Sequence, residues 1–424
     1  MARIVLSTIG SLGDLHPKIA LALELRLRGH SCIINTLERY RGRIEELGFE
    51  FARLRPEVEE ADPELMARAM DARTGPEVVI RELMMPALDE TYEDLGAATE
   101  GADVMVTGEL LYVAPSLAAK TGMPWISVSL QPLSMFSSHD PNVYPTAELL
   151  NYIRFMPAAF HARLFEFMKQ YVGHWFEPVA EFRRKLGLPE DHDPVFRDKY
   201  SPLLHLAMFS RVLSPPQPDW PPNTVQTGFC FYDESEKSEL DSGLAAFLDA
   251  GEPPIVFTLG SAASMDPGGF FDESVTAAKK LGRRAVFIYG REMEPPRALT
   301  AGMIAVDYAP YSLVFPRAAV VVHQGGVGTT GQVLRAGVPH LIMPYSHDQP
   351  DNAARCKRAG VAEVISRKRY TAAASAAVLK RVLNTPSYAQ RARELKKVVD
   401  SEPGTSLACD AIEDALRRSS HSLR

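Results

Sequence analysis

Short β-branched and apolar runs alternate with helical patterns along this chain, and this alternation constrains the fold more than any other feature. In the first half, runs at 3–9 and 31–36 flank a helical pattern at 17–28, and further runs follow at 103–107 and 125–130. Strands that alternate with helices usually join one parallel sheet, because each helix carries the chain back to the end where the next strand begins. We therefore expect the first half to be an α/β domain with a parallel sheet.

The alternation stops at a proline-rich segment and then begins again. Five of the nine residues from Ser214 to Pro222 are proline, which excludes a helix and a central strand there. Strand-like runs follow at 254–259, 284–289, 303–306, 318–322 and 340–343. The sequence thus predicts an α/β protein with two doubly wound, Rossmann-like domains. The expected boundaries are an N-terminal domain at 1–213, a linker at 214–225, a second domain at 226–400, and a C-terminal helix at 401–424 that packs back on the first domain.

Composition narrows the classes of partner. The chain has 424 residues, 46% of them hydrophobic, and 46 Lys and Arg against 53 Asp and Glu give a net charge of −7. A mildly acidic chain has no general attraction for a phosphate backbone, so we expect no nucleic-acid partner. The four cysteines are scattered without a CxxC pair, which predicts neither a disulfide framework nor a zinc knuckle and suits a cytoplasmic protein. No stretch approaches the roughly 18 consecutive apolar residues of a membrane span.

The most informative motif is a buried strand that turns through glycines into a helix, at 320–331. Glycines let the backbone approach a ligand closely, and the first turn of the helix offers unpaired N–H groups to an anion. Thr329 adds a hydroxyl donor, and His323 at the end of the strand can donate to a second phosphate oxygen. We expect a diphosphate site here.

The same segment also matches the GxGxxG fingerprint of dinucleotide-binding proteins, with Asp348 twenty residues after Gly328, where a ribose-binding acid would lie. An NAD-dependent oxidoreductase would use this fingerprint, and a plain strand-to-helix turn would also explain the glycines. The strand at 340–343, however, leads to a cluster of Asp348, Gln349 and Asn352, whose carboxylate and amides suit sugar hydroxyls. The oxidoreductase gives this cluster no role, so the combination favours a sugar nucleotide.

His-x-Gly-Gly-x-Gly-Thr at 323–329, Gly-Val-Pro at 337–339 and Pro-x-x-x-Asp-Gln at 344–349 resemble the donor-binding signature of family 1, UDP-glycosyltransferase-like, glycosyltransferases. The resemblance implies the GT-B fold, in which two Rossmann-like doubly wound domains face each other across a cleft. It also implies that the glycine-rich turn and its histidine hold the donor diphosphate, that the Asp-Gln pair holds the hexose, and that a Gly-Ser turn and an aromatic segment complete the donor site. The expected donor-binding residues are Gly260, Ser261, Tyr308, His323, Gly325, Gly326, Gly328, Thr329, Asp348, Gln349 and Asn352.

A second motif, Gly-Ser-Leu-Gly-Asp-Leu-His-Pro at 10–17, resembles the opening of bacterial and sterol-type members, including rhamnosyltransferases. Many members carry a catalytic histidine directly after the second glycine, whereas this chain has Asp14 there and His16 two residues later. Asp14 is therefore the expected base, although an aspartate at this place can also cap the following helix. His16 is either an alternative base or a residue that satisfies a backbone carbonyl, and we favour the second.

The acceptor side is marked by composition rather than by a motif. Ten of the 36 aromatic residues lie between 131 and 178; part of them fill a core, and the rest suit an apolar acceptor. The expected acceptor-binding residues are Phe136, Met84 and Glu109, with a solvated loop carboxylate as the alternative for Glu109. Asp191-His192-Asp193 matches an Asp-x-Asp metal motif but lies in a proline-bounded turn, so we expect no metal site.

Together these observations predict an inverting, metal-independent hexosyltransferase without a cofactor. It would move a hexose from a nucleoside diphosphate sugar, of UDP-glucose or dTDP-rhamnose type, to a hydroxyl of a small lipophilic or aromatic acceptor. A nucleotide-sugar epimerase of the same fold, an NAD-dependent oxidoreductase and a catalytically silent sugar-nucleotide binder are the remaining alternatives.

Overall fold

The computed structural model describes residues 1–57, 63–144, 152–190, 192–233, 239–260, 267–290 and 293–422. The chain divides into two compact units, one formed by Met1–Tyr232 with Pro403–Arg424 and the other by Asp233–Glu402. Each unit is built on one parallel sheet, as the alternation of strand and helix patterns predicts. No helix within these described ranges is long and apolar enough to cross a membrane.

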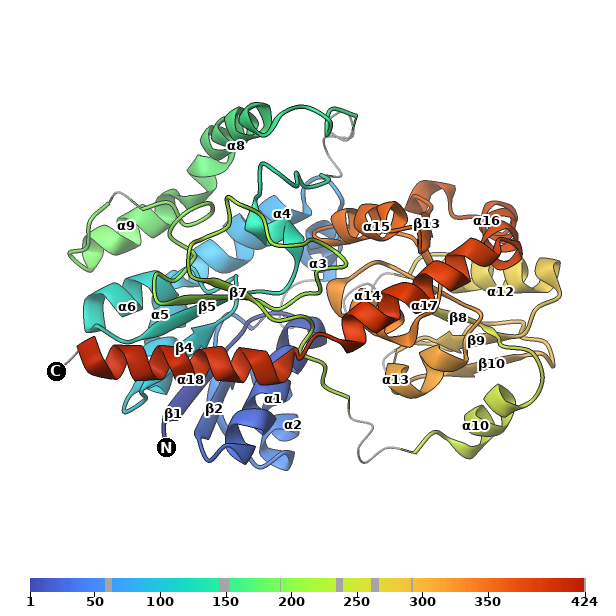
Figure 1. Ribbon diagram of the computed structural model, residues 1–424, viewed down its shortest axis with the longest axis horizontal. Coiled ribbons are helices and arrows are strands. Elements are labelled where there is room, and N and C mark those ends of the chain that lie inside the picture. Colours follow the sequence, from blue (N-terminus) through green and yellow to red (C-terminus); the bar gives the residue numbers. More distant parts are fainter. Residues whose placement is uncertain are drawn as a thin grey trace. The chain divides into compact units, whose positions relative to one another are not determined.

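The first unit contains a seven-stranded parallel sheet of order β3-β2-β1-β4-β5-β6-β7 (Figure 1). Its strands are β1 (Arg3–Ser7), β2 (Ser31–Thr36), β3 (Glu50–Arg53), β4 (Val104–Thr107), β5 (Trp125–Ser129), β6 (Leu204–Ala207) and β7 (Thr224–Gln226). The strand order changes direction between β1 and β4, and ligands of open α/β sheets bind at the carboxyl ends of such strands. Because Ser7 of β1 pairs with Thr107 of β4, the turns that follow these two strands leave the same edge of the sheet.

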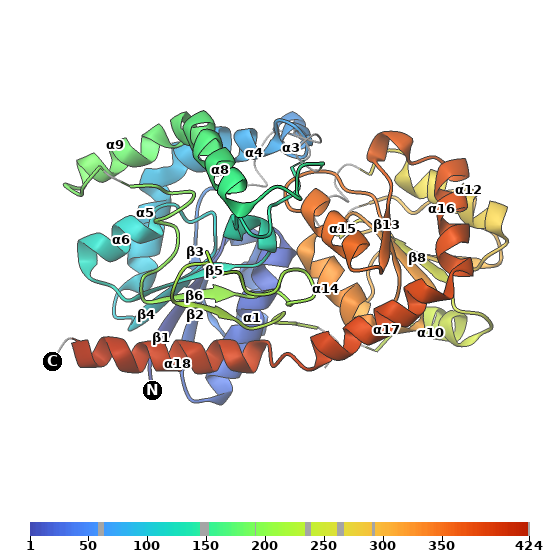
Figure 2. The ribbon, with the colours of Figure 1, turned by 45° about the horizontal axis from the view of Figure 1, so that its top comes forward.

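Helices cover both faces of this sheet. Figure 2 shows α1 and α18 on one face, where they contact each other, and α5, α6 and α9 on the opposite face. The helices are α1 (Leu12–Leu27), α2 (Arg41–Glu46), α3 (Pro63–Ala69), α4 (Gly75–Val78), α5 (Leu88–Thr99), α6 (Ala114–Thr121), α8 (Ala158–Gly173), α9 (Glu177–Lys185) and α18 (Thr405–Ser422). Short 3-10 segments are η1 (Glu38–Tyr40), η3 (Met85–Ala87), η4 (Pro132–Met135) and η5 (His174–Phe176), and η2 (Val79–Met84) is a π-helix.

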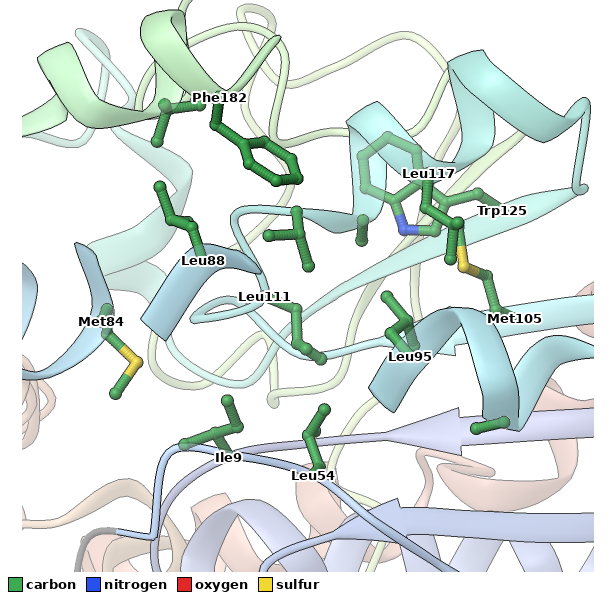
Figure 3. Packing of buried hydrophobic residues seen from close by; sticks show 14 of the residues in the cluster. Ile9, Leu54, Met84, Leu88, Leu95, Met105, Leu111, Leu117, Trp125 and Phe182 are labelled. Atoms are coloured by element: carbon green, nitrogen blue, oxygen red, sulfur yellow. The ribbon is translucent and has the colours of Figure 1, made fainter. Parts of the chain in front are cut away.

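An apolar core fills the space between the sheet and the helices α5, α6 and α9 (Figure 3). Val5 and Met105 face it from paired positions of β1 and β4, because side chains of a strand alternate between the two faces. Leu95 of α5, Leu117 of α6 and Phe182 of α9 meet them from the helical layer. This packing fixes the two central strands, and with them the turns at their carboxyl ends.

The second unit repeats the architecture with a six-stranded parallel sheet of order β10-β9-β8-β11-β12-β13. Its strands are β8 (Ile255–Thr258), β9 (Ala285–Ile288), β10 (Met303–Val306), β11 (Val320–His323), β12 (His340–Ile342) and β13 (Ala362–Val364). Its helices are α10 (Ser242–Asp249), α12 (Phe270–Leu281), α13 (Tyr311–Val314), α14 (Val327–Ala336), α15 (Gln349–Arg358), α16 (Ala372–Asn384) and α17 (Pro386–Asp400), with 3-10 segments η7 (Phe315–Arg317) and η8 (Arg367–Arg369). α10 and α14 pack on one face, and α12 and α16 lie on the other.

The boundary between the units lies later than the expected linker at 214–225. The proline-rich segment packs on the first unit, where the rings of Trp220 and Phe209 meet edge to face with centroids 5.8 Å apart. The chain then adds β7 to the first sheet, and the second unit begins only after Tyr232. Proline prevents regular backbone pairing but leaves neighbouring side chains free to pack, so proline content misplaces the boundary.

Candidate active site

Asp14 lies in the first turn of α1, directly after the turn that follows β1. It forms a capping box with Ser11, whose backbone N–H and hydroxyl both lie within hydrogen-bonding distance of Asp14 Oδ2, at 2.8 and 3.2 Å. Both contacts end on the same carboxylate oxygen, and within the described residues Oδ1 has no hydrogen-bond partner. Asp14 therefore caps the helix with one oxygen and leaves the other available to accept a proton.

Gly10 makes room for this carboxylate. Its φ of +137° is one that residues with a side chain rarely adopt, and a Cβ on Gly10 would overlap Asp14 Oδ2. The backbone and the carboxylate thus both require glycine at this position.

The ionisation of Asp14 is shifted toward neutral pH. Burial raises its pKa from the ordinary 3.8 to about 6, and the charge of Glu109 adds to the rise, whereas the hydrogen bonds from Ser11 and the charge of Lys18 oppose it. A carboxylate with this pKa is ionised at pH 7 and is a stronger base than an ordinary aspartate, as general-base catalysis requires.

His16 Nε2, unlike Asp14 Oδ1, is already in contact with another side chain. The Arg43 guanidinium lies 3.2 Å from His16 Nε2, and the ring packs edge to face on Tyr232 with centroids 5.2 Å apart. Because a guanidinium can only donate, Nε2 is the acceptor in this contact. Nε2 can therefore act as a base only after its contact with Arg43 breaks.

A pocket lies in the first unit at the carboxyl ends of β4 and β5. Its lining includes Glu109, Trp125, Lys199, Tyr200 and His205. Glu109 is half-buried, so it is not a fully solvated loop carboxylate. It accepts a hydrogen bond from the Leu130 N–H at 3.1 Å, together with bonds from two side chains of the loop after β5. This loop therefore holds Glu109 at the pocket.

The other two expected acceptor residues lie elsewhere. Phe136 follows η4 and packs on Phe196, with centroids 4.6 Å apart, while the Lys199 ammonium lies 4.6 Å from its ring centroid. It therefore contacts the pocket wall through Lys199. Met84 is 4% exposed and belongs to the core beneath α5 (Figure 3). Among the described residues it is not part of the pocket lining, because its apolar side chain is taken up by core packing.

In the second unit, His323 is the last residue of β11 and is completely buried. The Gly325 N–H donates to His323 Nδ1 at 3.1 Å, so the proton of the neutral ring lies on Nε2, which donates to His340 Nδ1 at 3.0 Å. Burial lowers the pKa of His323 to about 3, which keeps this ring neutral. Both ring nitrogens are thus engaged within the unit, and Nε2 must leave His340 before it can donate to a phosphate.

The glycine-rich turn leads into α14, with Gly326 as its N-cap residue. Gly328 and Thr329 belong to the first turn of this helix, where the helix supplies no carbonyl to their N–H groups. Gly260, after β8, has φ of +65°, and a Cβ there would lie 3.2 Å from Thr329 Oγ1 and overlap the Gln324 amide. The turns after β8 and β11 therefore meet closely, as expected for one binding surface.

The predicted sugar-binding cluster connects two turns of the second unit. Asp348 Oδ2 accepts hydrogen bonds from the Val327 N–H at 3.1 Å and from Asn352 Nδ2 at 2.7 Å. Asn352 also donates to the Gly325 carbonyl at 3.0 Å, and the Gln349 side-chain oxygen accepts from the Tyr345 N–H. Gln349 and Asn352 are buried and Asp348 is half-buried, so the two amides hold the turns and Asp348 is the more accessible group.

Three remaining expectations concern single positions. Tyr308 is half-buried and follows β10, whereas Ser261 lies outside the described residues. Asp191 also lies outside them, and Asp193 is held in a turn by an ion pair with Lys169 at 2.7 Å and by the backbone N–H groups of residues 195 and 196. In the described ranges, no group of three or more His, Cys, Asp or Glu side chains is arranged to hold a metal ion.

Sequence reasoning missed three buried polar residues next to these sites: Lys18, Gln324 and His340. Lys18 had a detectable signal, because it follows Leu15 by three positions and precedes Ala22 by four on the apolar face of α1. His340 begins β12 in an otherwise apolar run, and its position beside β11 follows only from the strand pairing. Gln324 lies within the glycine motif but is not one of its defining residues.

Comparison with known proteins gives matches along most of the chain. Residues 4–89 match the glycosyltransferase family 28 N-terminal domain, and residues 285–413 match the erythromycin biosynthesis protein CIII-like C-terminal domain. The chain is 32% identical over 434 residues to O-mycaminosyltylonolide 6-deoxyallosyltransferase of Streptomyces fradiae, with 97% of each chain covered.

Two solved structures share the fold. The glycotransferase of kitacinnamycin matches with a TM-score of 0.71 and 23% identity over 98% of both chains. The spinosyn rhamnosyltransferase complexed with thymidine diphosphate matches with a TM-score of 0.69 and 16% identity, covering 97% of this chain and 100% of the other.

Proposed function

The chain belongs to the GT-B glycosyltransferases, and we propose that it is an inverting enzyme that transfers a hexose to a hydroxyl of a small lipophilic acceptor. The proposed donor is a thymidine or uridine diphosphate sugar. The proposal rests on Asp14, which lies at the carboxyl end of β1. One oxygen of its carboxylate caps α1, and the other has no hydrogen-bond partner among the described residues. This is the edge of the sheet where α/β folds bind their ligands.

In the proposed reaction, Asp14 Oδ1 accepts the proton of the acceptor hydroxyl while the acceptor oxygen attacks the anomeric carbon. The bond from that carbon to the diphosphate breaks on the opposite face, so a single displacement inverts the configuration. In the second unit, the N–H groups of Gly328 and Thr329 and the positive end of the α14 dipole would stabilise the charge of the leaving diphosphate. These groups would interact more strongly with the departing diphosphate, as its negative charge develops, than with the intact sugar nucleotide.

The relatives support the choice of donor and acceptor. The Streptomyces fradiae relative is named for the transfer of 6-deoxyallose to O-mycaminosyltylonolide, and one matching structure holds thymidine diphosphate. We therefore propose a thymidine diphosphate 6-deoxyhexose as the first donor to try. The pocket beside Glu109, with Trp125 and Tyr200 in its lining, has room for little more than a water molecule in this structure, so only the reacting hydroxyl of the acceptor would enter it.

Metal independence belongs to the same proposal. The Asp193 carboxylate is occupied by Lys169 and by backbone N–H groups, so it stabilises its own turn. We expect turnover to survive excess chelator, and Asp193→Asn to lower thermal stability more than turnover. Loss of transfer on chelation, restored by a divalent cation, would contradict metal independence.

The decisive experiment is a transfer assay with a panel of thymidine and uridine diphosphate sugars and hydroxylated apolar acceptors. We expect a glycoside product by mass spectrometry, and the coupling constant of its anomeric proton should show inversion relative to the donor. Conversion of one sugar nucleotide into another without acceptor would favour an epimerase. Tight binding of NAD with no affinity for either nucleoside diphosphate would favour an oxidoreductase.

A further inference from the structure

Lys18 occupies an unusual position for a lysine. It lies on the buried face of α1, its side chain is 0% exposed, and its Nζ has no hydrogen-bond partner within the described residues. Lysine is among the residues least often buried, and an ammonium group away from water and without a partner is costly. An apolar residue would fill the same space without this cost, so the buried amine calls for a functional explanation.

The Lys18 charge interacts electrostatically with Asp14. The two residues are four positions apart on α1, a spacing that places their side chains on the same side of the helix one turn apart. The ionisable groups that act on Lys18 are Asp14 on its own helix, Glu109 after β4 and Cys230 in the segment after β7. Burial raises the pKa of the Cys230 thiol to about 12, so it stays uncharged, and the two carboxylates are the anions that act electrostatically on the Lys18 ammonium.

We propose that Lys18 is a positioning residue that keeps Asp14 in its carboxylate form, ready to accept the proton of the acceptor hydroxyl. This inference rests on the proposed function, in which Asp14 is the base. Because Nζ is sealed inside the first unit, Lys18 acts through Asp14 and does not touch the substrate.

The ionisation of the two groups fits this role. Burial lowers the pKa of Lys18 to about 7, while burial raises that of Asp14 to about 6 against the opposing charge of Lys18. As pH rises, Asp14 therefore loses its proton while Lys18 is still charged. Removal of the ammonium leaves burial and Glu109 to act on Asp14 with less opposition, which shifts its pKa further upward.

The test is Lys18→Met, which replaces the amine by an unbranched apolar side chain. We expect the acid limb of the kcat/KM profile to move to higher pH, by up to about one pH unit. Activity at pH 6 should fall relative to the alkaline plateau, by about fivefold for a shift of one pH unit from about 6, and the plateau itself should be largely kept. The melting temperature should not fall, because a buried amine without a hydrogen-bond partner among the described residues has been removed.

A direct readout separates this inference from the proposed function. The pKa of Asp14 can be measured by NMR in protein labelled with ¹³C at the aspartate carboxyls, where the Asp14 resonance is the one that disappears in Asp14→Asn. Its titration midpoint should lie at higher pH in Lys18→Met than in the wild type. This measurement needs no turnover. If the wild-type protein transfers no sugar, the proposed function fails. The titration still shows whether Lys18 lowers the pKa of Asp14.

Lys120→Met is the matched control, because Lys120 is an exposed lysine of the same unit that donates to the Leu186 carbonyl. It should leave the pH profile and the Asp14 titration unchanged. An unshifted Asp14 titration in Lys18→Met would overturn the proposal, and so would an equal loss of activity at every pH together with a lower melting temperature. If Lys18→Met does not fold, Lys18→Leu repeats the test; failure of both to fold would show that the amine serves the fold itself, and would also overturn the proposal.

Discussion

Replacement of Asp14 by asparagine separates the proton-accepting role from helix capping. Asp14 is the third residue of α1 in a capping box, and the asparagine side chain keeps a carbonyl oxygen that can accept the same hydrogen bonds from Ser11. Only the ability to take up a proton is lost. We expect turnover to fall by roughly 10²–10⁴-fold, the range that general-base catalysis contributes.

The same variant carries a stability prediction whose sign follows from the pKa. Folding raises the pKa of Asp14 from 3.8 to about 6, so the folded state binds this proton more tightly than the unfolded state does. The free energy of unfolding therefore falls as pH rises from about 4 to about 6, and at pH 7 the ionised carboxylate costs at most about 3 kcal/mol, at 1.36 kcal/mol per pH unit. Asparagine never ionises, so Asp14→Asn should be at least as stable as the wild type at pH 7.

Chemical unfolding at pH 4.5 and pH 7.5, beside a transfer assay, measures both effects. We expect the variant to gain stability relative to the wild type between the two pH values while it loses turnover. His16→Ala is the matched control, and it should cost modestly, since His16 Nε2 is engaged by Arg43. If Asp14→Asn stays near full activity while His16→Ala abolishes transfer, then the base is His16 and the assignment of Asp14 is wrong.

Three further predictions follow from the turns around the two sites. Gly10→Ala should lower both stability and turnover, because its φ of +137° is strained for alanine and the new Cβ would displace the Asp14 carboxylate. Thermal unfolding and kcat measure the two effects, and a variant with wild-type values would contradict this geometry. His323→Ala should weaken thymidine diphosphate binding about tenfold or more in calorimetry, because the Gly325 N–H loses its acceptor and the glycine turn is no longer held; unchanged affinity would exclude a role for the ring. Nucleotide binding should show no titration of His323 near pH 6, because burial lowers the pKa of this ring to about 3; a binding step centred near pH 6 that disappears in His323→Ala would contradict this.

The sequence predicts most strands of the two sheets, including the edge strand β10, but it misses the edge strands β3, β7 and β13 and the buried interior strand β6. The apolar runs at 3–9, 103–107 and 125–130 correspond to β1, β4 and β5, which are buried on both faces and therefore lack polar alternation. The unpredicted strand β3 lies at an edge, begins and ends with charged residues, and has no buried side chain. The unpredicted β7 has three half-buried residues. Short edge strands of this kind form because a neighbour is already in place, and a local pattern does not contain the neighbour.

Some contacts of the candidate site can likewise be predicted from adjacent residues, whereas others depend on the pairing of strands that are distant in the sequence. The 10–17 motif contains Gly10, Ser11 and Asp14, so the capped carboxylate could be predicted from adjacent residues. The partner of His323 could not, because His340 is seventeen residues away and reaches it only through the pairing of β11 with β12. A contact that depends on sheet register becomes visible only when the fold is assembled.

Burial favours the neutral forms of ionisable groups in both units, but its consequence for pH dependence differs between them. In the first unit it raises the pKa of Asp14 to about 6 and lowers that of Lys18 to about 7, so both groups titrate close to neutral pH. In the second unit it lowers the pKa of His323 and His340 far enough that both rings stay neutral wherever the protein would be assayed. A general base must change its protonation state during the reaction, whereas a turn that holds a diphosphate must keep its shape throughout. Among these four groups, the pH dependence of turnover should therefore come from Asp14 and Lys18, and substitutions of His323 should change affinity without moving the acid limb of the rate profile.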